Sequence, residues 1–182
     1  MLLLASASPR RKELLKKLVP EFLVFPANID ERILDNVLDP RDLPKEESKL
    51  KAYDVFRHYP NDEILACDTI VIVDGRELGK PKSKEEAYRM LAFESAKKQI
   101  VLSGYTYLSK EKEITRTVRT EVYFNSLSEE QIHYYVDTFL PLDKAGSYGI
   151  QDDFPLIQKI VGSYDNVMGL PTEDLAKHVF IR

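Results

Sequence analysis

The ten residues from Ile64 to Val73, ILACDTIVIV, carry the strongest strand signal in the chain and constrain its fold most. The Asp74-Gly75 dipeptide that follows has the chemistry of a hairpin turn, so the strand ends there. Asp68 lies inside this apolar run, with Thr69 on the opposite face, and a buried carboxylate is costly unless it is paired, bound to a metal or held at a raised pKa. Desolvated carboxylates gather at active sites, so Asp68 is a candidate catalytic residue; the structural alternative is an ion pair with a lysine.

Further strands are spread along the chain and alternate with helices. The pattern of apolar residues predicts them over residues 1–5, 22–25, 99–109, 113–124 and 156–160. The two longest are joined by a short turn and form a hairpin, so the fold class is α/β or α+β. We expect a two-lobed fold around a mixed β-sheet flanked by helices, with a central active-site cleft. No repeat or low-complexity linker divides the 182 residues, so we expect a single domain over 1–182.

Helices are predicted from their apolar spacing and from the residues that begin and end them. They run from residue 9 to just before Pro20, from 44 to 59, from 83 to about 91, from 128 to just before Pro141, and from 172 onward. Two of them begin with capping-box spacing, Ser83 with Glu86 and Ser128 with Gln131. The segment 162–171 is predicted to be a loop.

The first helix begins in an unusual way. Ser8 is a good N-cap and Pro9 suits the first helical position, but Arg10, Arg11 and Lys12 then place cations at the positive pole of the helix. A helix N-terminus binds anions, and arginine adds bidentate phosphate contacts. Arg11 shares the helix face of the leucines that follow, which directs it toward the protein. The pattern favours anion binding over a solvated cationic face.

Two glycine-containing segments are weaker candidates. Gly79-Lys80-Pro81 combines close backbone approach with a point charge, but it lacks the spacing of a P-loop. The tract Asp143–Gln151, DKAGSYGIQ, has two glycines, which indicate either turns or backbone that meets a ligand. Gln151 carries an amide that can pair with the edge of a nucleobase. A structural loop with a surface glutamine explains the same residues equally well.

Composition limits the class of protein. The formal net charge of −4 argues against a general nucleic-acid binder, and no apolar stretch approaches the length of a membrane span. The single cysteine, Cys67, excludes an internal disulfide and suits a reducing compartment, so we expect a cytoplasmic protein. Cys67 fits a small buried residue better than a nucleophile. The motifs CxxC, HExxH, GxGxxG and GxSxG are absent from the sequence.

Taken in order, several segments together resemble the Maf family of nucleotide pyrophosphatases. These segments are ASASPRRKELL, Asp30-Glu31, KLKA at Lys49–Ala52, CDTIVIVDG, LGKP, LSEEQI, DKAGSYGIQ and NVMGLP. No one of them is specific, but their order is. The resemblance implies hydrolysis of a nucleoside triphosphate to the monophosphate and pyrophosphate, a divalent metal such as Mg²⁺ or Mn²⁺, and a homodimer.

The resemblance also implies roles for individual residues. Asp68 would be the catalytic carboxylate that activates water, and the other charged or polar active-site positions fall on Ser6, Arg11, Glu31, Lys51 and Lys80. Phosphate would be held by Ser8, Arg11 and Lys80, and the metal by Glu31 and Asp68. Arg10, Thr69 and Gln151 match the branch that acts on dTTP and UTP, so they are the predicted specificity residues.

The sequence departs from the family pattern at two places. Where the family has LSGxxH after the third helix, this chain has Phe93–Gln99, FESAKKQ, without the glycine or the histidine. Where the family has a GxGA-type segment after Gln151, this chain has Asp152–Pro155, DDFP. Both changes bear on the shape of the base pocket.

Two other functions fit the same sequence. One is a nucleotide-binding regulator of cell division with little or no catalysis, which the altered segments keep open. The other is a phosphatase that releases orthophosphate. Identifying the released anion, with dTTP and UTP among the substrates, separates all three.

Overall fold

The computed structural model describes residues 1–34 and 39–181, and the side chains of Glu31 and Arg32 lie outside the described part. The chain divides into two compact units. Unit 1 comprises Met1–Thr69, Leu102–Val118 and Asp165–Arg182, and unit 2 comprises Ile70–Val101 and Arg119–Tyr164. Each is described here by itself.

The strands form one seven-stranded mixed sheet in the order β2-β1-β3-β5-β6-β7, with β4 paired to β3. They are β1 (Leu2–Leu4), β2 (Leu23–Val24), β3 (Glu63–Val73), β4 (Arg76–Leu78), β5 (Lys98–Leu108), β6 (Glu113–Phe124) and β7 (Ile157–Val161). β1 is parallel to β2 and β3, whereas β4 is antiparallel to β3 and β7 to β6. The mixed sheet predicted from the sequence is therefore confirmed.

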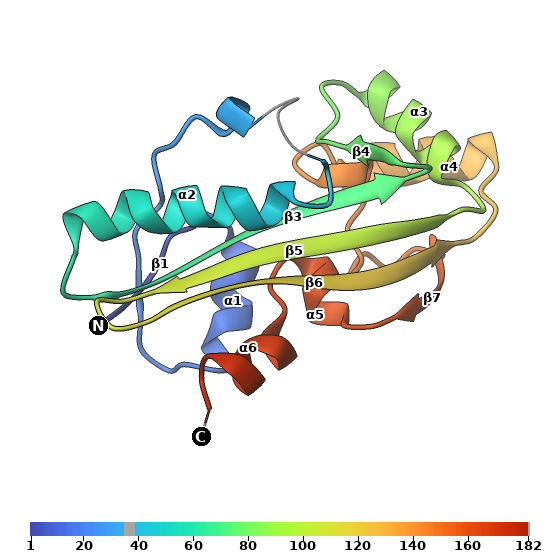
Figure 1. The fold of residues 1–182 in the computed structure, drawn as a ribbon. Helices are drawn as coiled ribbons and strands as arrows, with labels where there is room; N and C mark the ends of the chain where they lie inside the picture. The colour runs from blue at the N-terminus through green and yellow to red at the C-terminus, as the bar shows by residue number, and fades with distance from the viewer. Residues whose placement is uncertain (35–38, 182) are drawn as a thin grey trace. The chain divides into compact units, whose positions relative to one another are not determined.

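Helices cover both faces of the sheet in unit 1 (Figure 1). Among the described residues, the α-helices are α1 (Pro9–Lys16), α2 (Leu43–His58), α3 (Lys84–Glu94), α4 (Glu129–Phe139), α5 (Tyr164–Met168) and α6 (Thr172–His178), and the 3₁₀ turns are η1 (Glu31–Leu34) and η2 (Ala145–Ser147). Alternate residues of β3 separate the two layers: Ile64 and Ala66 pack with α2, and Leu65 and Cys67 with α1 and α6.

A glycine in β5 lets α2 lie close to the sheet. A Cβ atom on Gly104 would lie 2.2 Å from the backbone nitrogen of Lys45 and 2.3 Å from the carbonyl carbon of Pro44. Backbone cannot move aside as a flexible side chain can. Beside this contact, the hydroxyls of Ser48 in α2 and Thr106 in β5 are 2.8 Å apart. The first turn of α2 is thus fixed on β5, and this placement determines where Lys51 projects.

The structure corrects the prediction for residues 162–171, which contain the short helix α5 rather than only loop. Five residues are too few to show helical periodicity, and Gly169, with φ of +119°, ends the segment. α1 also ends at Lys16, earlier than predicted, and α3 continues to Glu94. These differences lie at element boundaries, where local signals are weakest.

Of the two predicted capping boxes, one forms completely and the other only in part. Ser128 and Gln131 form the full reciprocal capping box at the start of α4. Ser83 caps α3 by accepting from the backbone N–H of Glu86 at 3.1 Å. The Glu86 carboxylate, however, accepts from the N–H of Lys82 at 3.0 Å rather than from the N-cap residue. The sequence therefore predicted the cap of α3 correctly, but the reciprocal bond goes to its neighbour.

In unit 2, α3 lies beside α4, and ring stacking joins them. The rings of Tyr88 and His133 stack 4.0 Å apart, and the hydroxyl of Tyr88 donates to Asp137 at 2.6 Å. After α3 the chain turns through Ala96, whose φ of +58° is a left-handed conformation that glycine adopts more readily. Aligned on Ser95, the glycine of the family pattern falls on Ala96, so the turn is kept without it.

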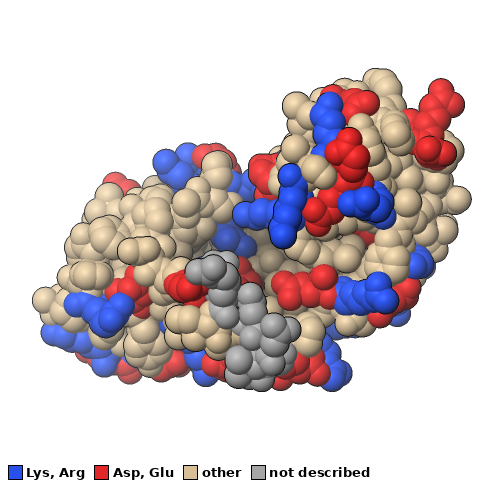
Figure 2. All heavy atoms as spheres, turned by 90° about the horizontal axis from the view of Figure 1, so that it is seen from above, with Lys and Arg blue, Asp and Glu red and all other residues tan. Residues whose placement is uncertain are grey.

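Acidic and basic side chains are interspersed on the face that Figure 2 shows. This distribution agrees with the small net charge of the chain. Among the described residues, no helix combines the length and the apolar character needed to cross a membrane.

Candidate active site

The turn between β1 and α1 is built from its own serine side chains. The Oγ of Ser6 accepts from the N–H of Ser8 at 3.1 Å, and the Oγ of Ser8 accepts from the N–H of Arg11 at 3.3 Å. Ser8 is therefore the N-cap that the sequence predicted. Pro9 has no N–H, so several donors of this helix end are already used or missing. Any anion bound here is held mainly by side chains.

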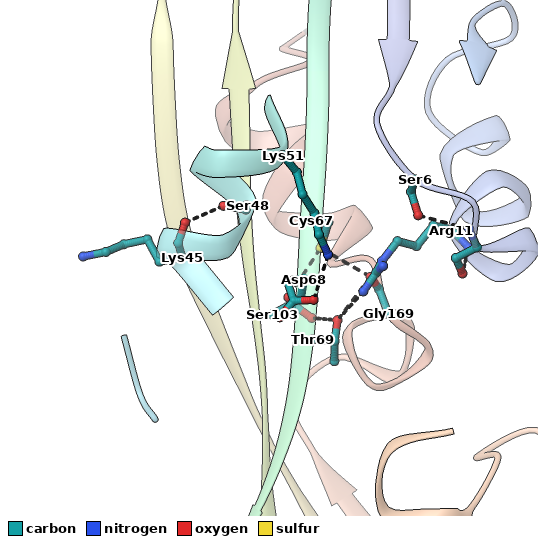
Figure 3. A network of polar contacts seen from close by, with 11 residues as sticks. Ser6, Arg11, Lys45, Ser48, Lys51, Cys67, Asp68, Thr69, Ser103 and Gly169 are labelled. Atoms are coloured by element: carbon teal, nitrogen blue, oxygen red, sulfur yellow. Dashed lines mark hydrogen bonds and ion pairs between the residues drawn. The ribbon is translucent and has the colours of Figure 1, made fainter. Parts of the chain in front are cut away.

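Arg11 points from α1 toward Thr69, in the middle part of β3 (Figure 3). Its Nε donates to the carbonyl oxygen of Gly169 at 2.7 Å, and its Nη2 donates to Oγ1 of Thr69 at 3.1 Å. The inward direction predicted from the leucine face of α1 is confirmed. A guanidinium has five N–H donors, and these contacts use two of them. Arg11 is thus held at a fixed angle with donors remaining for a ligand.

Thr69 belongs to a chain of hydroxyl groups. Its Oγ1 lies 2.8 Å from Oγ of Ser103, and the Oγ of Ser103 donates to the carbonyl oxygen of Asn166 at 3.4 Å. Asn166, in α5, is fully buried. Thr69 therefore links Arg11 on one side to β5 and α5 on the other.

Asp68 lies on the other face of β3, toward α2. The Nζ of Lys51 lies 3.2 Å from Oδ1 of Asp68, and the two side chains are 13% and 14% exposed. A carboxylate in such a position is costly without an opposite charge, and Lys51 supplies it. The ion pair with a lysine, which was the structural alternative for Asp68, is thus observed, and its catalytic role stays a prediction. Both partners keep some access to solvent, which a reacting group needs.

Alternation along β3 separates the predicted residues into two groups (Figure 3). Asp68 meets Lys51 from α2, and Thr69 meets Arg11 from α1. The predicted opposite orientation of Asp68 and Thr69 is confirmed. The phosphate candidate Arg11 consequently lies with the specificity candidate Thr69 rather than with Asp68.

Cys67 is a structural residue. It is fully buried, and its Sγ lies 3.4 Å from the carbonyl oxygen of Gly169. Burial raises the pKa of its thiol, although the positive charge of Arg11 opposes the shift. Because the thiolate is the nucleophilic form, this environment makes Cys67 unreactive. The prediction of a small buried residue is confirmed.

Of the remaining predicted residues, two lie in unit 2, one lies in unit 1, and one has a side chain outside the described part. Lys80, just after β4, and Gln151, at the end of the DKAGSYGIQ tract, are both exposed. Arg10, in unit 1, is half-buried. Glu31 begins η1, but its side chain lies outside the described residues.

The carboxylate of Asp68, in the middle of β3, is an oxygen ligand that a divalent cation could use. Among the described residues, no group of three or more His, Cys, Asp or Glu side chains is arranged to hold a metal. Mg²⁺ is commonly bound through one or two carboxylates together with substrate phosphates, and it keeps several waters. Asp68 therefore fits a cation that binds together with a nucleotide.

Comparison with protein families gives a match to one family model. It is described as "Maf-like protein", and it covers residues 1–180. The chain belongs to the Maf family. The resemblance drawn from the order of the sequence motifs is thereby confirmed.

Curated relatives of this Maf chain have similar lengths. A Thermococcus gammatolerans protein named "dTTP/UTP pyrophosphatase" is 42% identical over 178 residues, covering 97% of this chain and 94% of the relative. A Pyrococcus abyssi protein of the same name is 44% identical, covering 94% and 90%. A solved structure, "Nucleoside-triphosphatase / dITP/XTP pyrophosphatase" from Mycobacterium abscessus, matches with a TM-score of 0.48 at 12% identity, covering 98% of this chain and 94% of that one.

Two residues that contact the candidate site were not predicted from the sequence. Gly169 anchors Arg11 through its carbonyl oxygen, and Ser103 continues the hydroxyl chain from Thr69. Gly169 lies in NVMGLP, a segment that contributed to the family resemblance. That segment indicated the family but gave no function for Gly169 itself. Ser103 lies in a buried strand, where a hydroxyl with no charged neighbour gives no functional signal.

Proposed function

We propose that this chain hydrolyses nucleoside triphosphates, with dTTP, UTP and modified pyrimidine analogues as substrates, to the monophosphate and pyrophosphate. This would remove unwanted nucleotides from the cellular pool. The observation that carries the proposal is the Asp68–Lys51 pair at 3.2 Å, a mostly buried but accessible carboxylate in the middle of β3. The 42% identity to proteins named dTTP/UTP pyrophosphatase supports the substrate class.

In the proposed reaction, Asp68 orients a water molecule and accepts its proton as the water oxygen attacks the α-phosphorus. The bond from that phosphorus to the bridging oxygen breaks, and pyrophosphate leaves with the electron pair. Lys51, whose Nζ lies 3.2 Å from Oδ1 of Asp68, offsets the charge of this carboxylate before the attack. Positioning and charge neutralisation do most of the catalytic work in such reactions.

Arg11, in unit 1, and Lys80, in unit 2, are each proposed to contact phosphate oxygens, with Ser8 as a further phosphate contact. Arg11 is suited to this because Gly169 and Thr69 fix its plane and leave it further N–H donors. Asp68, with Glu31 as the second proposed ligand, would hold Mg²⁺ or Mn²⁺, which neutralises charge on phosphate oxygens.

Base selection is proposed to involve Arg10, Thr69 and Gln151. A pocket built from hydrogen-bonding groups rejects a base that leaves those groups unpaired. The Thr69 hydroxyl already bonds Arg11 and lies next to Ser103. We therefore infer that Thr69 affects selection through the orientation of Arg11, while Gln151 contacts the base edge.

The functional form is proposed to be one domain over 1–182, acting in the cytoplasm as a homodimer without nucleic-acid or membrane partners. The interspersed charges in Figure 2 support the absence of a nucleic-acid partner, and the single buried cysteine supports the compartment. A cysteine-poor chain suits a reducing compartment. The oligomeric state can be measured by sedimentation.

The test is to identify the anion released from dTTP and UTP in the presence of Mg²⁺. Pyrophosphate release by the wild-type protein, lost in Asp68→Asn, is the expected result. Orthophosphate as the first product would indicate a phosphatase. Tight nucleotide binding without either anion would indicate the alternative function, a regulator without useful catalysis.

A further inference from the structure

Glu94, the last residue of α3, is an acidic side chain buried inside unit 2. It is 0% exposed, and its Oε1 accepts from Nε2 of Gln99 at 3.1 Å. Its second oxygen, Oε2, has no hydrogen-bond partner among the described residues. A buried acid with a single neutral donor is expensive to keep, so its presence calls for a role.

The carboxyl group fills the space beside Gly146, in the DKAGSYGIQ tract. A Cβ atom on Gly146 would lie 2.7 Å from Oε1 of Glu94, and the glycine has φ of +73°. The N–H of Gly146 donates to the carbonyl oxygen of Gly79 at 3.1 Å. Glu94 therefore packs against the residue that ties the tract to the Gly79-Lys80 turn.

A second contact runs from Glu94 to the same tract through Gln99. The Oε1 of Gln99 accepts from the hydroxyl of Tyr148 at 2.6 Å. Tyr148 is itself held edge-on against the ring of Phe124, with centroids 5.0 Å apart. Glu94 thus supports the tract at Gly146 by packing and at Tyr148 by hydrogen bonds.

The far side of the tract has an independent support. The N–H of Gly149 donates to the hydroxyl of Tyr135 at 2.9 Å, and that hydroxyl donates to Asp152 at 2.6 Å. Neither bond involves Glu94. A change at Glu94 should therefore affect the backbone of Gly146 but not that of Gly149, so the two can be compared within one variant.

The environment of Glu94 favours its neutral form. Burial raises the pKa of this carboxyl well above its ordinary value, and the hydrogen bond from Gln99 opposes the shift only in part. A neutral carboxyl packs against backbone as an amide of the same shape would. Glutamine is accordingly the conservative replacement at this position.

We propose that Glu94 is a positioning residue that holds Gly146, and through it fixes both the Gly79-Lys80 turn and the tract that ends at Gln151. The inference rests on the proposed function and deepens it, because Lys80 and Gln151 are the proposed phosphate and base contacts of unit 2. Glu94 itself touches no substrate in this account. It acts through the backbone that carries those two side chains.

The variants Glu94→Gln and Glu94→Ala test the proposal, with Leu91→Ala as the matched control. Leu91 is also fully buried in α3, so its truncation destabilises the same helix without removing the contact to Gly146. At a temperature where all variants are folded, Glu94→Ala should lower kcat/KM for dTTP about tenfold, because small misplacements of positioning groups are costly. Glu94→Gln should keep kcat/KM close to the wild-type value. Leu91→Ala should also leave kcat/KM unchanged.

Hydrogen exchange gives a readout that does not depend on activity. In Glu94→Ala the amide of Gly146 should exchange faster, by about tenfold, while that of Gly149 changes little, since local opening is governed by local contacts. Wild-type exchange at Gly146 in Glu94→Ala, or equal losses of activity in Glu94→Ala and Leu91→Ala, would overturn the proposal. Wild-type protein that releases no pyrophosphate would instead contradict the proposed function, and the exchange comparison would still decide the Glu94 contact.

Discussion

The polar cluster of unit 1 and that of unit 2 handle charge in opposite ways. In unit 1, Asp68 faces Lys51 and is partly accessible, and Arg11 is held by neutral oxygens of Gly169 and Thr69. In unit 2, Glu94 is fully buried beside neutral groups, and one of its oxygens has no described partner. The first arrangement keeps charges ready for a charged ligand, whereas the second removes charge and holds backbone in place.

Under the proposed function, the difference separates residues that would react from residues that would position them. A charged pair with some access to solvent can meet a charged ligand or a water molecule. A neutral group in a dry core meets neither ligand nor solvent, and it acts by packing against its neighbours. Substitutions in the two clusters should therefore fail in different ways, and the following predictions run from the largest effect to the smallest.

Asp68→Asn removes the proposed proton acceptor and should give the largest loss. We expect pyrophosphate release to fall by about 10²–10⁴-fold or more, the range for general-base residues. Nucleotide affinity should be largely kept, because the amide has the same shape and no repulsive charge toward phosphate. Calorimetric titration of dTTP, alongside the activity assay, checks both parts. Full turnover in Asp68→Asn would remove this residue from the mechanism.

Arg11→Lys tests whether the anchored plane of the guanidinium matters. A lysine carries the charge but cannot reproduce the fork that spans Gly169 and Thr69, so kcat/KM should fall by about 10–100-fold. Lys16→Met is the control, since Lys16 lies in the same helix and is paired at the surface with Glu13. Steady-state kinetics of both variants make the measurement. Equal activity of Arg11→Lys and wild type would show that only the positive charge of Arg11 matters, and not the fixed plane of its guanidinium.

Gly146→Ala probes the packing of Glu94 against the tract. The substitution should lower the free energy of unfolding by about 1–3 kcal/mol through a strained φ and the clash with Oε1 of Glu94. Gly75→Ala is a matched control: its φ is +75°, against +73° for Gly146, but nothing lies within 4 Å of the added Cβ. Urea unfolding should show the larger loss for Gly146→Ala, and the excess should disappear in the Glu94→Ala background. An equal loss in both glycine variants would mean that Glu94 does not press on Gly146.

Glu94→Gln should have the smallest effect, on stability alone, and the effect should depend on pH. The pKa of Glu94 is raised in the folded protein, so its contribution is fully present below the ordinary value of 4.5 and is lost as the pH rises through the raised pKa. The glutamine variant does not titrate, so its free energy of unfolding should exceed that of wild type increasingly as the pH rises through this interval.

Glu13→Gln should show the opposite dependence of stability on pH in the same experiment. The bond from Lys16 lowers the pKa of the exposed Glu13, so its contribution is present above the ordinary pKa and is lost as the pH falls. Urea unfolding across the pH range measures both variants. A constant difference between Glu94→Gln and wild type would show that Glu94 is not kept neutral by folding.

Local rules of the sequence predicted much of unit 1. The period of two along β3 put Asp68 and Thr69 on opposite faces, and the Ser8-Pro9 pair gave the start of α1. The leucine face of α1 gave the inward direction of Arg11. Each of these follows from a few neighbouring residues, and for that reason each could be read without the fold.

What the sequence did not reveal depends on contacts between distant residues. Gly169 lies 158 positions from Arg11, and a backbone carbonyl has no residue type that marks it. Glu94 sits at the end of a charged helix, where an acid is ordinarily exposed, yet it is buried and packs against Gly146, which lies far along the chain. The altered segment Phe93–Gln99 is thus explained by its partners in unit 2 rather than by its own pattern.

The central claim, that Asp68 and its partners form a hydrolytic site and not only a binding site, is tested most directly by product analysis. Wild type and Asp68→Asn would be incubated with dTTP, UTP, dATP and dGTP in the presence of Mg²⁺, and the released anion identified by ion chromatography. We predict pyrophosphate from dTTP and UTP with wild type only, and much less from the purine nucleotides. Pyrophosphate from Asp68→Asn at the wild-type rate, or none from the wild type, would contradict the account.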